Sequence, residues 1–308
     1  MTSSTSTPRR ASAAASSWSY AGVKAGGSER TIRIGSTVER LLVRTWNLFH
    51  GNTQPPGRKA FLSEMVRLAS ADGPAVVCLQ EVPIWALGRL DDWSGLPAIG
   101  AVAQRPTLGP LPSTPELGRV LTEVNHGLLR SAFTGQANAM LLASDLRIRE
   151  HRQVVLNPFG FRRAQARGLG LGLVERLAWG KERRVCQAVR VQRGGETLII
   201  GNLHATGFAD KRVTDAELLR AAVFVDGMAK PDEPVLLCGD FNVGLHNSRT
   251  LSDLAGTDWG FDGPTPLGID HILVRGLEAS PPVRWPDDRR RHEGRLLSDH
   301  APVEREVA

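Results

Sequence analysis

Short apolar runs that end in polar residues recur along this chain, and they predict a protein rich in β-strands. In one of them, the apolar residues 235–238 are followed by Gly239, Asp240 and Asn242. The pattern predicts strands at residues 41–47, 74–79, 138–143, 146–156, 171–178, 185–192, 197–204, 235–239 and 269–274, and a last strand from Ala301.

Helical spacing of apolar residues predicts three helices. The first covers residues 57–69, and the second covers 115–130, where Pro115 suits the first turn. The third opens with Thr214 and Glu217 at capping-box spacing and runs to about residue 228. Because the helix at 115–130 has one apolar face, we expect it to cover a sheet. Many short strands with few helices between them predict an α+β sandwich, in which two packed sheets have helices outside.

Composition divides the chain into a tail and a folded region. Residues 1–38 are rich in Ser, Thr, Ala and Gly, which predicts a disordered N-terminal tail. Residues 39–308 are predicted to form one catalytic domain, since 308 residues with 41% hydrophobic content can bury a sizeable core. Arg9 and Arg10 resemble an export signal, but the residues that follow are too polar for one. No run approaches the length of a membrane span.

Charge and cysteine content suggest partners and a compartment. A formal net charge of +6 and a pI near 9.8 favour anionic partners such as nucleic acid, phosphorylated metabolites or acidic lipids. The cysteines are Cys78, Cys186 and Cys238, and each lies in an apolar run, as buried reduced thiols do. We therefore expect a cytoplasmic protein.

The polar ends of the strands contain residues that could carry chemistry. Asp240 and Asn242 are two apart on an extended end, so both could hold a water, a cation or a phosphate oxygen, although Gly, Asp and Asn are also ordinary turn residues. Glu81 could anchor Mg²⁺ or lie in solvent. His204 could donate a proton near neutral pH or be structural. The remaining candidates are Asn47, Asp270, Asp299 and His300.

Taken together, these segments resemble the endonuclease/exonuclease/phosphatase superfamily, of which the deoxyribonuclease-like phosphoesterases are members. The resemblance covers residues 41 to 305 and rests on six motifs in the family's order: Thr45-Trp46-Asn47, Leu79-Gln80-Glu81, Asn202-Leu203-His204, Gly239-Asp240-Phe241-Asn242, Asp270-His271-Ile272 and Ser298-Asp299-His300. It implies a four-layer α/β/β/α sandwich of two mainly antiparallel sheets. It also implies a Mg²⁺-dependent phosphodiester hydrolase, with Mn²⁺ as a possible substitute, in which water attacks the phosphorus atom in line.

The resemblance also implies roles for individual residues. The metal residues would be Asn47, Glu81 and Asp299, and the catalytic residues would be His204, Asp240, Asn242, Asp270 and His300. Either Asp240 or the Asp270–His300 pair would remove the water proton. Asn138 resembles a substrate-contacting asparagine of the family.

The sequence leaves three hypotheses for the function and substrate. A first hypothesis is an endonuclease or exonuclease acting on nucleic acid, which the basic balance favours. A second is a phosphoesterase of small metabolites or phospholipid head groups, similar to sphingomyelinases or inositol phosphatases. A non-catalytic binding protein is a third, although every residue of the family pattern is present. The sole tyrosine, Tyr20, lies in the tail, so the active-site tyrosine of abasic-site endonucleases has no counterpart. Arg289 and Arg291, in the basic segment 284–295, are predicted to bind substrate or to be solvated.

Overall fold

The computed structural model describes residues 40–108, 111–207 and 210–308, which belong to one compact unit. The predicted tail lies outside the described residues. Two mixed sheets form the centre of this unit. The six-stranded sheet has the order β13-β16-β1-β3-β7-β4, with strands β1 (Leu41–Asn47), β3 (Val76–Val82), β4 (Ala98–Gln104), β7 (Gln136–Leu142), β13 (Val283–Arg284) and β16 (Val303–Val307).

The second sheet has five strands in the order β12-β11-β10-β9-β8. These strands are β8 (Arg147–Val155), β9 (Val185–Arg193), β10 (Glu196–His204), β11 (Val235–Asp240) and β12 (Asp270–Arg275). Most neighbours are antiparallel, but β1 runs parallel to β3 and β10 runs parallel to β11. Smaller ladders are formed by β2 (Thr53–Gln54), β14 (Arg291–His292) and β15 (Arg295–Leu297), and by β5 (Thr107–Leu108) and β6 (Leu111–Pro112).

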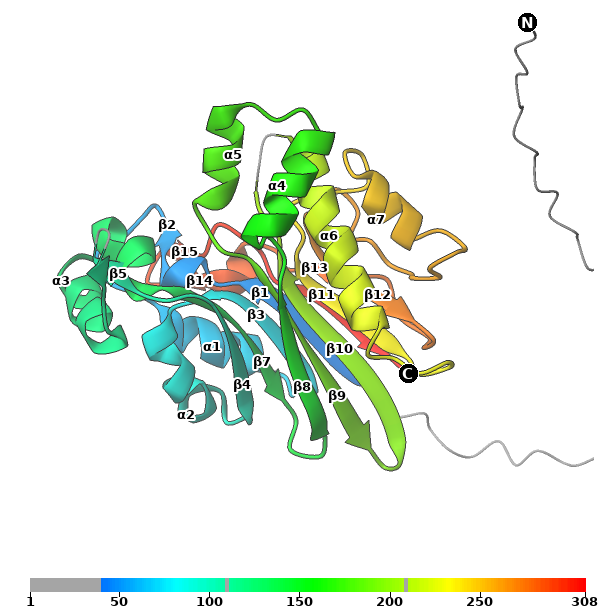
Figure 1. Cartoon of the computed structure of the whole chain (residues 1–308). Helices are drawn as coiled ribbons and strands as arrows, with labels where there is room; N and C mark the ends of the chain where they lie inside the picture. The colour runs from blue at the N-terminus through cyan, green and yellow to red at the C-terminus, as the bar shows by residue number, and fades with distance from the viewer. Residues whose placement is uncertain (1–39, 109–110, 208–209) are drawn as a thin grey trace, which may run out of the picture. The chain divides into compact units, whose positions relative to one another are not determined.

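Helices cover the outer faces of both sheets (Figure 1). The helical elements are α1 (Leu62–Ser70), α2 (Leu90–Ser94), α3 (Pro115–Thr134), α4 (Phe159–Gly168), α5 (Leu173–Gly180), α6 (Lys211–Asp226) and α7 (Arg249–Leu254), with 3₁₀ turns η1 (Phe49–Gly51), η2 (Ile84–Arg89) and η3 (Asp288–Arg290). Side chains of α1 and α2 pack against the six-stranded sheet, and those of α6 and α7 pack against the five-stranded sheet.

A third apolar cluster lies between the two sheets. It joins Val43 and Met140 of the six-stranded sheet to Ile200 and Leu236 of the five-stranded sheet. With one cluster inside and one on each outer face, the structure confirms the α+β sandwich of four layers. All three cysteines are buried and free, as predicted.

Three sequence predictions about helices need correction. Residues 171–178 were predicted as a strand, but 173–180 form helix α5, whose first turn is capped by Glu175 accepting a hydrogen bond from the Gly172 amide at 2.7 Å. The first helix begins at Leu62, because Asn52 and Thr53 hold the preceding residues in a turn. The third begins at Lys211 behind the cap Asp210, and the expected capping-box residues point into the protein instead.

Helix α3 begins where it was predicted, but several of its apolar side chains in the described part are not packed against a sheet. The Thr114 hydroxyl accepts a hydrogen bond from the Leu117 amide at 3.3 Å, and Pro115 occupies the first turn. However, Leu117, Val120 and Val124 of its apolar stripe are exposed. The helix was therefore predicted correctly, whereas the expectation that Leu117, Val120 and Val124 pack on a sheet was wrong, because an apolar stripe does not specify what packs against it.

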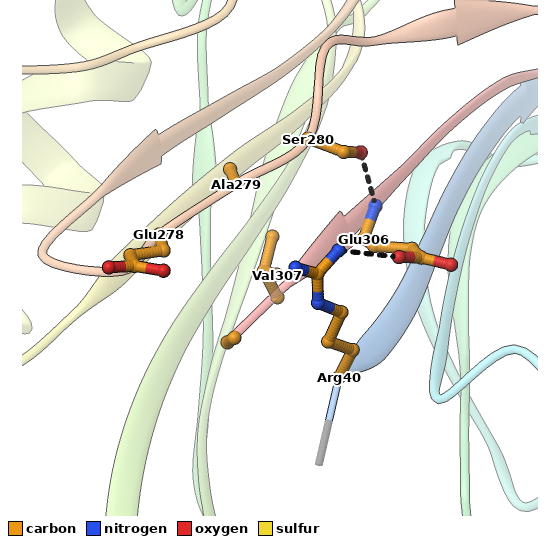
Figure 2. A pocket seen from close by; sticks show the side chains of 7 residues that line it. Arg40, Glu278, Ala279, Ser280, Glu306 and Val307 are labelled. Atoms are coloured by element: carbon orange, nitrogen blue, oxygen red, sulfur yellow. Dashed lines mark hydrogen bonds and ion pairs between the residues drawn. The ribbon is translucent and has the colours of Figure 1, made fainter. Parts of the chain in front are cut away.

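A small hollow of about 100 Å³ lies where β1 begins and β16 ends. Figure 2 shows that the Arg40 guanidinium approaches Glu306 there, with a distance of 3.1 Å between Nη1 and Oε2. The Ser280 hydroxyl accepts a hydrogen bond from the Glu306 amide. Because β1 carries its predicted site residue, Asn47, at its other end, this hollow is distant from the predicted chemistry.

Candidate active site

Strand direction brings the predicted polar residues to one end of the sandwich. Parallel pairing of β1 with β3 sets Asn47 beside Gln80, one residue before Glu81. Parallel pairing of β10 with β11 sets His204 beside Asp240. Strand β12 runs antiparallel to β11 and begins at Asp270, directly opposite Asp240. The ends of strands from both sheets therefore meet at one place.

Asp240 is the centre of the hydrogen-bond network. Its Oδ2 atom accepts a hydrogen bond from Asn47 Nδ2 at 2.9 Å and another from Asn242 Nδ2 at 3.2 Å. Its Oδ1 atom accepts from the Asn242 amide at 3.0 Å. His204 Nε2 lies 3.4 Å from Oδ2 on a third side. Because the carboxylate is almost fully buried, these donors fix its orientation.

His300 forms a pair with Asp270. His300 Nδ1 lies 2.9 Å from Asp270 Oδ2 and 3.1 Å from Oδ1, which leaves Nε2 directed toward Asp240 at 3.8 Å. A carboxylate on Nδ1 fixes the ring's orientation and stabilises its cationic form. The expected Asp–His pair is therefore present in the geometry.

Glu81 provides a carboxylate at the edge of this network. Its Oε1 atom lies 3.4 Å from Asn47 Nδ2 and 3.7 Å from His204 Nε2. Its Oε2 atom lies 3.4 Å from His50 Nε2. Nearby, Asp299 reaches the surface, where partial burial and the Glu81 carboxylate raise its pKa. The Glu81 and Asp299 carboxylates are thus close enough to influence each other electrostatically.

Backbone strain is concentrated around the same place. Nine non-glycine residues of the described part have positive φ, a conformation that costs about 1–3 kcal/mol in a non-glycine residue. Five of them are adjacent to or within the candidate site: Phe49, His50, Glu81, Asn242 and Ser298. At Glu81 the pairing of β3 with β7 also shifts register. Strain that gathers in this way typically marks a functional site.

Burial and neighbouring charges shift the pKa values of the central pair. Burial, together with the Asp270 carboxylate, raises the pKa of Asp240 to about 7, although His300 opposes the shift. Burial disfavours the charged form of His300, but the carboxylates of Asp270 and Asp240 outweigh it and raise the pKa of His300 to about 10. Both shifts favour the protonated form, so His300 is held as a cation beside Asp240.

His204 differs from the expectation of a titration near neutrality. Burial lowers its pKa well below the ordinary value, and the positive charge of Arg184 lowers it further. Arg184 Nη1 lies 2.8 Å from His204 Nδ1 and 2.9 Å from Nε2. In the metal-free site the imidazole is neutral at pH 7.

Two residues that shape the site, His50 and Arg184, had no predicted role, and a third, Arg290, was predicted only as part of the basic segment 284–295 that binds substrate or is solvated. His50 contacts Glu81, and Arg184 contacts His204. The buried Arg290 donates hydrogen bonds from Nη1 to the carbonyls of Leu297, Ser298 and His300, at 2.9, 3.0 and 3.1 Å. His50 follows the Trp46-Asn47 motif and could have been found from it, whereas the two arginines are not distinguishable in sequence from the many others.

The three predicted substrate-binding residues lie apart from this network. The Asn138 amide donates to the Val185 and Asn202 carbonyls at 3.1 and 3.3 Å, which joins the two sheets. Arg289 pairs with Glu304 and Asp72, both at 2.8 Å, and stacks on Trp285. Asp72 precedes β3, at the opposite end from Glu81. Arg291 is exposed on β14. Their substrate contacts stay predictions, and the structure gives Asn138 and Arg289 structural contacts.

A four-layer sandwich with carboxylates and histidines gathered at one end is compatible with a phosphoesterase. A sequence profile described as "Endonuclease/Exonuclease/phosphatase family" matches residues 45–300. The chain belongs to this family, whose members hydrolyse phosphoester bonds and generally depend on a divalent metal. No curated protein matches the sequence.

Solved structures share the fold at low sequence identity. An endonuclease/exonuclease/phosphatase from Bacteroides vulgatus is 14% identical, with a TM-score of 0.61, over 88% of this chain and 99% of that one. A family protein from Beutenbergia cavernae is 16% identical, with a TM-score of 0.60, over 87% and 71%. TDP2 from Caenorhabditis elegans is 15% identical, with a TM-score of 0.53, over 87% and 74%.

Two groups of side chains could hold a divalent ion. Asp240, Asp270 and His300 present ligand atoms within 4.8 Å of one another, but His300 Nδ1 is already bonded to Asp270. Glu81 and Asp299 offer the oxygen ligands that Mg²⁺ prefers. Asn47 turns its amide nitrogen, not its oxygen, toward Glu81, because its oxygen accepts from the Phe49 amide at 2.9 Å. In this rotamer Asn47 fits as a donor that orients Glu81.

Proposed function

We propose that this protein is a Mg²⁺-dependent phosphodiester hydrolase in which water attacks the phosphorus atom in line. The observation that carries the proposal is the convergence of Asp240, the Asp270–His300 pair and Glu81 at one end of the sandwich, where Asp240 accepts hydrogen bonds from Asn47 and Asn242 and lies 3.4 Å from His204 Nε2. Mn²⁺ is expected to substitute, since the same oxygen ligands accept it.

Each residue then has a role that follows from its contacts. Asp240 orients the attacking water and accepts its proton, because Asn47 and Asn242 hold both carboxylate oxygens in place. His300, held by Asp270, presents its Nε2–H to a phosphate oxygen. His204 stabilises charge next to the leaving group, with Arg184 beside it.

The metal would be held at Glu81, with Asp299 as a further ligand or as a ligand of bound water. A divalent ion there offsets the negative charge of the phosphodiester, which otherwise slows attack by an anionic nucleophile. The hydrogen-bond donors around the phosphodiester would be side chains of the protein. The positive charge of Arg184 and of the protonated His300 adds to that compensation.

Nucleic acid is the substrate we favour. The chain carries a formal net charge of +6, and a basic surface attracts polyanions. The family's own name covers endonucleases and exonucleases. Hydrolysis of small phosphoesters or phospholipid head groups is the second candidate, favoured by exposed aliphatic side chains on α5, in the segment that leads to Arg184 beside His204. We also propose a cytoplasmic location, which the three buried free thiols support. Within the described residues, no helix is long and apolar enough to cross a membrane.

A substrate panel tests the proposal. Purified protein is incubated with Mg²⁺, with and without EDTA, against plasmid, single-stranded oligonucleotide, bis-para-nitrophenyl phosphate and phospholipids. We expect cleavage of the nucleic acids and of the small diester, with EDTA abolishing both. Cleavage of the phospholipids alone would contradict the nuclease assignment, and cleavage unaffected by EDTA would contradict the metal.

A pair of glutamate variants tests the metal residue. We expect Glu81→Gln to raise the Mg²⁺ concentration needed for half-maximal cleavage of the small diester, and to lower the maximal rate by about 100-fold or more, because a neutral amide is a poorer Mg²⁺ ligand. Glu64→Gln, on helix α1, is the matched control. Equal Mg²⁺ dependence of the two variants would exclude Glu81 as the metal anchor.

A further inference from the structure

The segment 158–184, which we call the α4–α5 hairpin, ends next to the candidate site. It connects β8 to β9, and α4 and α5 lie together beyond one end of the sheets (Figure 1). Its last residue, Arg184, contacts His204. Trp179 Nε1 donates to Glu217 Oε1 at 2.6 Å, and Glu217 Oε2 accepts from the Thr206 amide at 2.7 Å, two residues after His204. The hairpin is thus fixed to the active-site end of the protein.

Most of the protein's net charge lies in this hairpin. It contains seven basic residues and two acidic ones, a formal charge of +5 against +6 for the whole chain. Both acidic residues are used locally, since Glu175 caps α5 and Glu182 pairs with Arg184 at 2.5 Å. In the described part of the chain, Arg163 and Arg176 form no ion pair. Several cations are therefore available to an anionic partner.

The same hairpin exposes large apolar side chains. Phe159, Leu173, Val174 and Leu177 are 72%, 68%, 79% and 66% exposed. Along α5, Trp179 is the one buried residue. Isolated exposed apolar residues are common, but a cluster of four marks an interaction surface. A hollow of about 680 Å³ between the two helices is lined by both kinds of residue, among them Phe159, Leu173, Leu177, Arg162, Arg163 and Arg176.

We propose that the α4–α5 hairpin binds the surface of an anionic phospholipid bilayer. The four apolar side chains enter the boundary between head groups and acyl chains, and the arginines contact lipid phosphates, as in interfacial amphipathic helices. Nucleic acid fits this surface less well, since bases stack on rings and three of the four side chains are aliphatic. The proposal concerns binding and holds whichever phosphodiester the site cleaves.

Vesicle co-sedimentation of the full chain tests this binding. We expect the protein to sediment with phosphatidylcholine vesicles that contain phosphatidylglycerol and not with pure phosphatidylcholine, and high salt to weaken the binding. The variant L173S/V174S/L177S should bind at least about tenfold more weakly, because three inserted side chains are lost. R163E/R176E should lose the preference for anionic vesicles.

A matched control comes from α3, which exposes Leu117, Val120 and Val124 in a helix of balanced charge. L117S/V120S/V124S should bind vesicles like the unmodified protein. All variants should cleave bis-para-nitrophenyl phosphate at the normal rate, which shows that they are folded. Equal sedimentation with neutral and anionic vesicles, or undiminished binding by the α5 variant, would overturn the proposal. So would a protein that ignores vesicles and loses oligonucleotide binding in the α5 variant.

Discussion

At the scale of single residues, the protonation of His300 is set by what surrounds it. The carboxylates of Asp270 and Asp240 raise its pKa from an ordinary 6.5 to about 10 in spite of burial. A group whose pKa is raised by folding stabilises the folded state fully below its unfolded pKa, and that contribution is lost as pH rises through the folded pKa. The raised pKa of Asp240 also makes stability decrease as pH rises, but at lower pH values, because folding favours the protonated carboxyl group.

The stability of the metal-free protein should therefore decrease as pH rises from 6.5 to 10. In the variant His300→Gln this part of the decrease should be absent, because the amide does not titrate. Denaturant unfolding in EDTA at several pH values measures the effect. The exposed His246→Gln serves as the control and should keep the decrease. If both variants show the same pH profile, His300 is not responsible.

At the scale of an element, the end of β11 is determined by Gly239. Its φ of +138° is a conformation that side chains rarely adopt, and a Cβ atom there would collide with the Leu203 carbonyl of β10. Glycine thus lets β11 lie against β10 while Asp240, the next residue, turns its carboxylate to Asn47. The backbone conformation at position 239 therefore requires glycine.

Gly239→Ala should destabilise the protein by about 3 kcal/mol, since strain and the steric conflict act together. It should also lower cleavage of the small diester in the protein that remains folded, because Asp240 moves with the strand end. Urea unfolding and steady-state rates give the two quantities. Gly88→Ala is the matched control, since Gly88 has open space around it and no positive φ. Comparable loss in the control would contradict this account.

At the scale of the whole molecule, amide side chains join the two sheets close to the site. Asn202 of β10 donates to the carbonyls of Leu79 and Ala139 in the other sheet, at 3.1 and 2.9 Å. It accepts from Gln80 at 2.8 Å. These bonds cross a cluster that is otherwise apolar, and polar groups buried there are costly unless paired. They fix the position of one sheet relative to the other at the end where the candidate site lies.

Asn202→Ala should cost about 3 kcal/mol of stability, because two carbonyls and the Gln80 amide lose a buried partner. It should also lower the cleavage rate while leaving the Mg²⁺ concentration needed for half-maximal cleavage nearly unchanged. The reason is that the two halves of the site shift relative to each other, whereas Glu81 keeps its place on its own sheet. Gln192→Ala, an amide on β9 that bonds Arg149, is the control and should have little effect. Unchanged stability of the Asn202 variant would show that the sheets do not need this link.

Sequence patterns predicted the polar residues that converge at one end of the sandwich better than the elements around them. Asp240 could be found because it follows an apolar run, and His300 because it precedes an apolar strand. The change from apolar to polar residues at a strand end is visible in the sequence. Residues 171–178 were wrongly predicted as a strand, since Leu, Gly and Val in alternation also fit a short exposed helix. The contact of Arg184 with His204 arises from the pairing of β9 with β10, and no local pattern contains it.

The distance along the chain between Trp46 and His300 has a consequence for synthesis. Trp46 Nε1 donates to the His300 carbonyl at 2.9 Å, and β16, which follows His300, pairs with β1. A growing polypeptide that has not yet reached residue 300 contains Glu81 and Asp240 but lacks the imidazole between Asp270 and Asp240. Under the proposed mechanism, which needs His300, hydrolysis would have to await nearly complete translation, and an unfinished copy on the ribosome would be inactive.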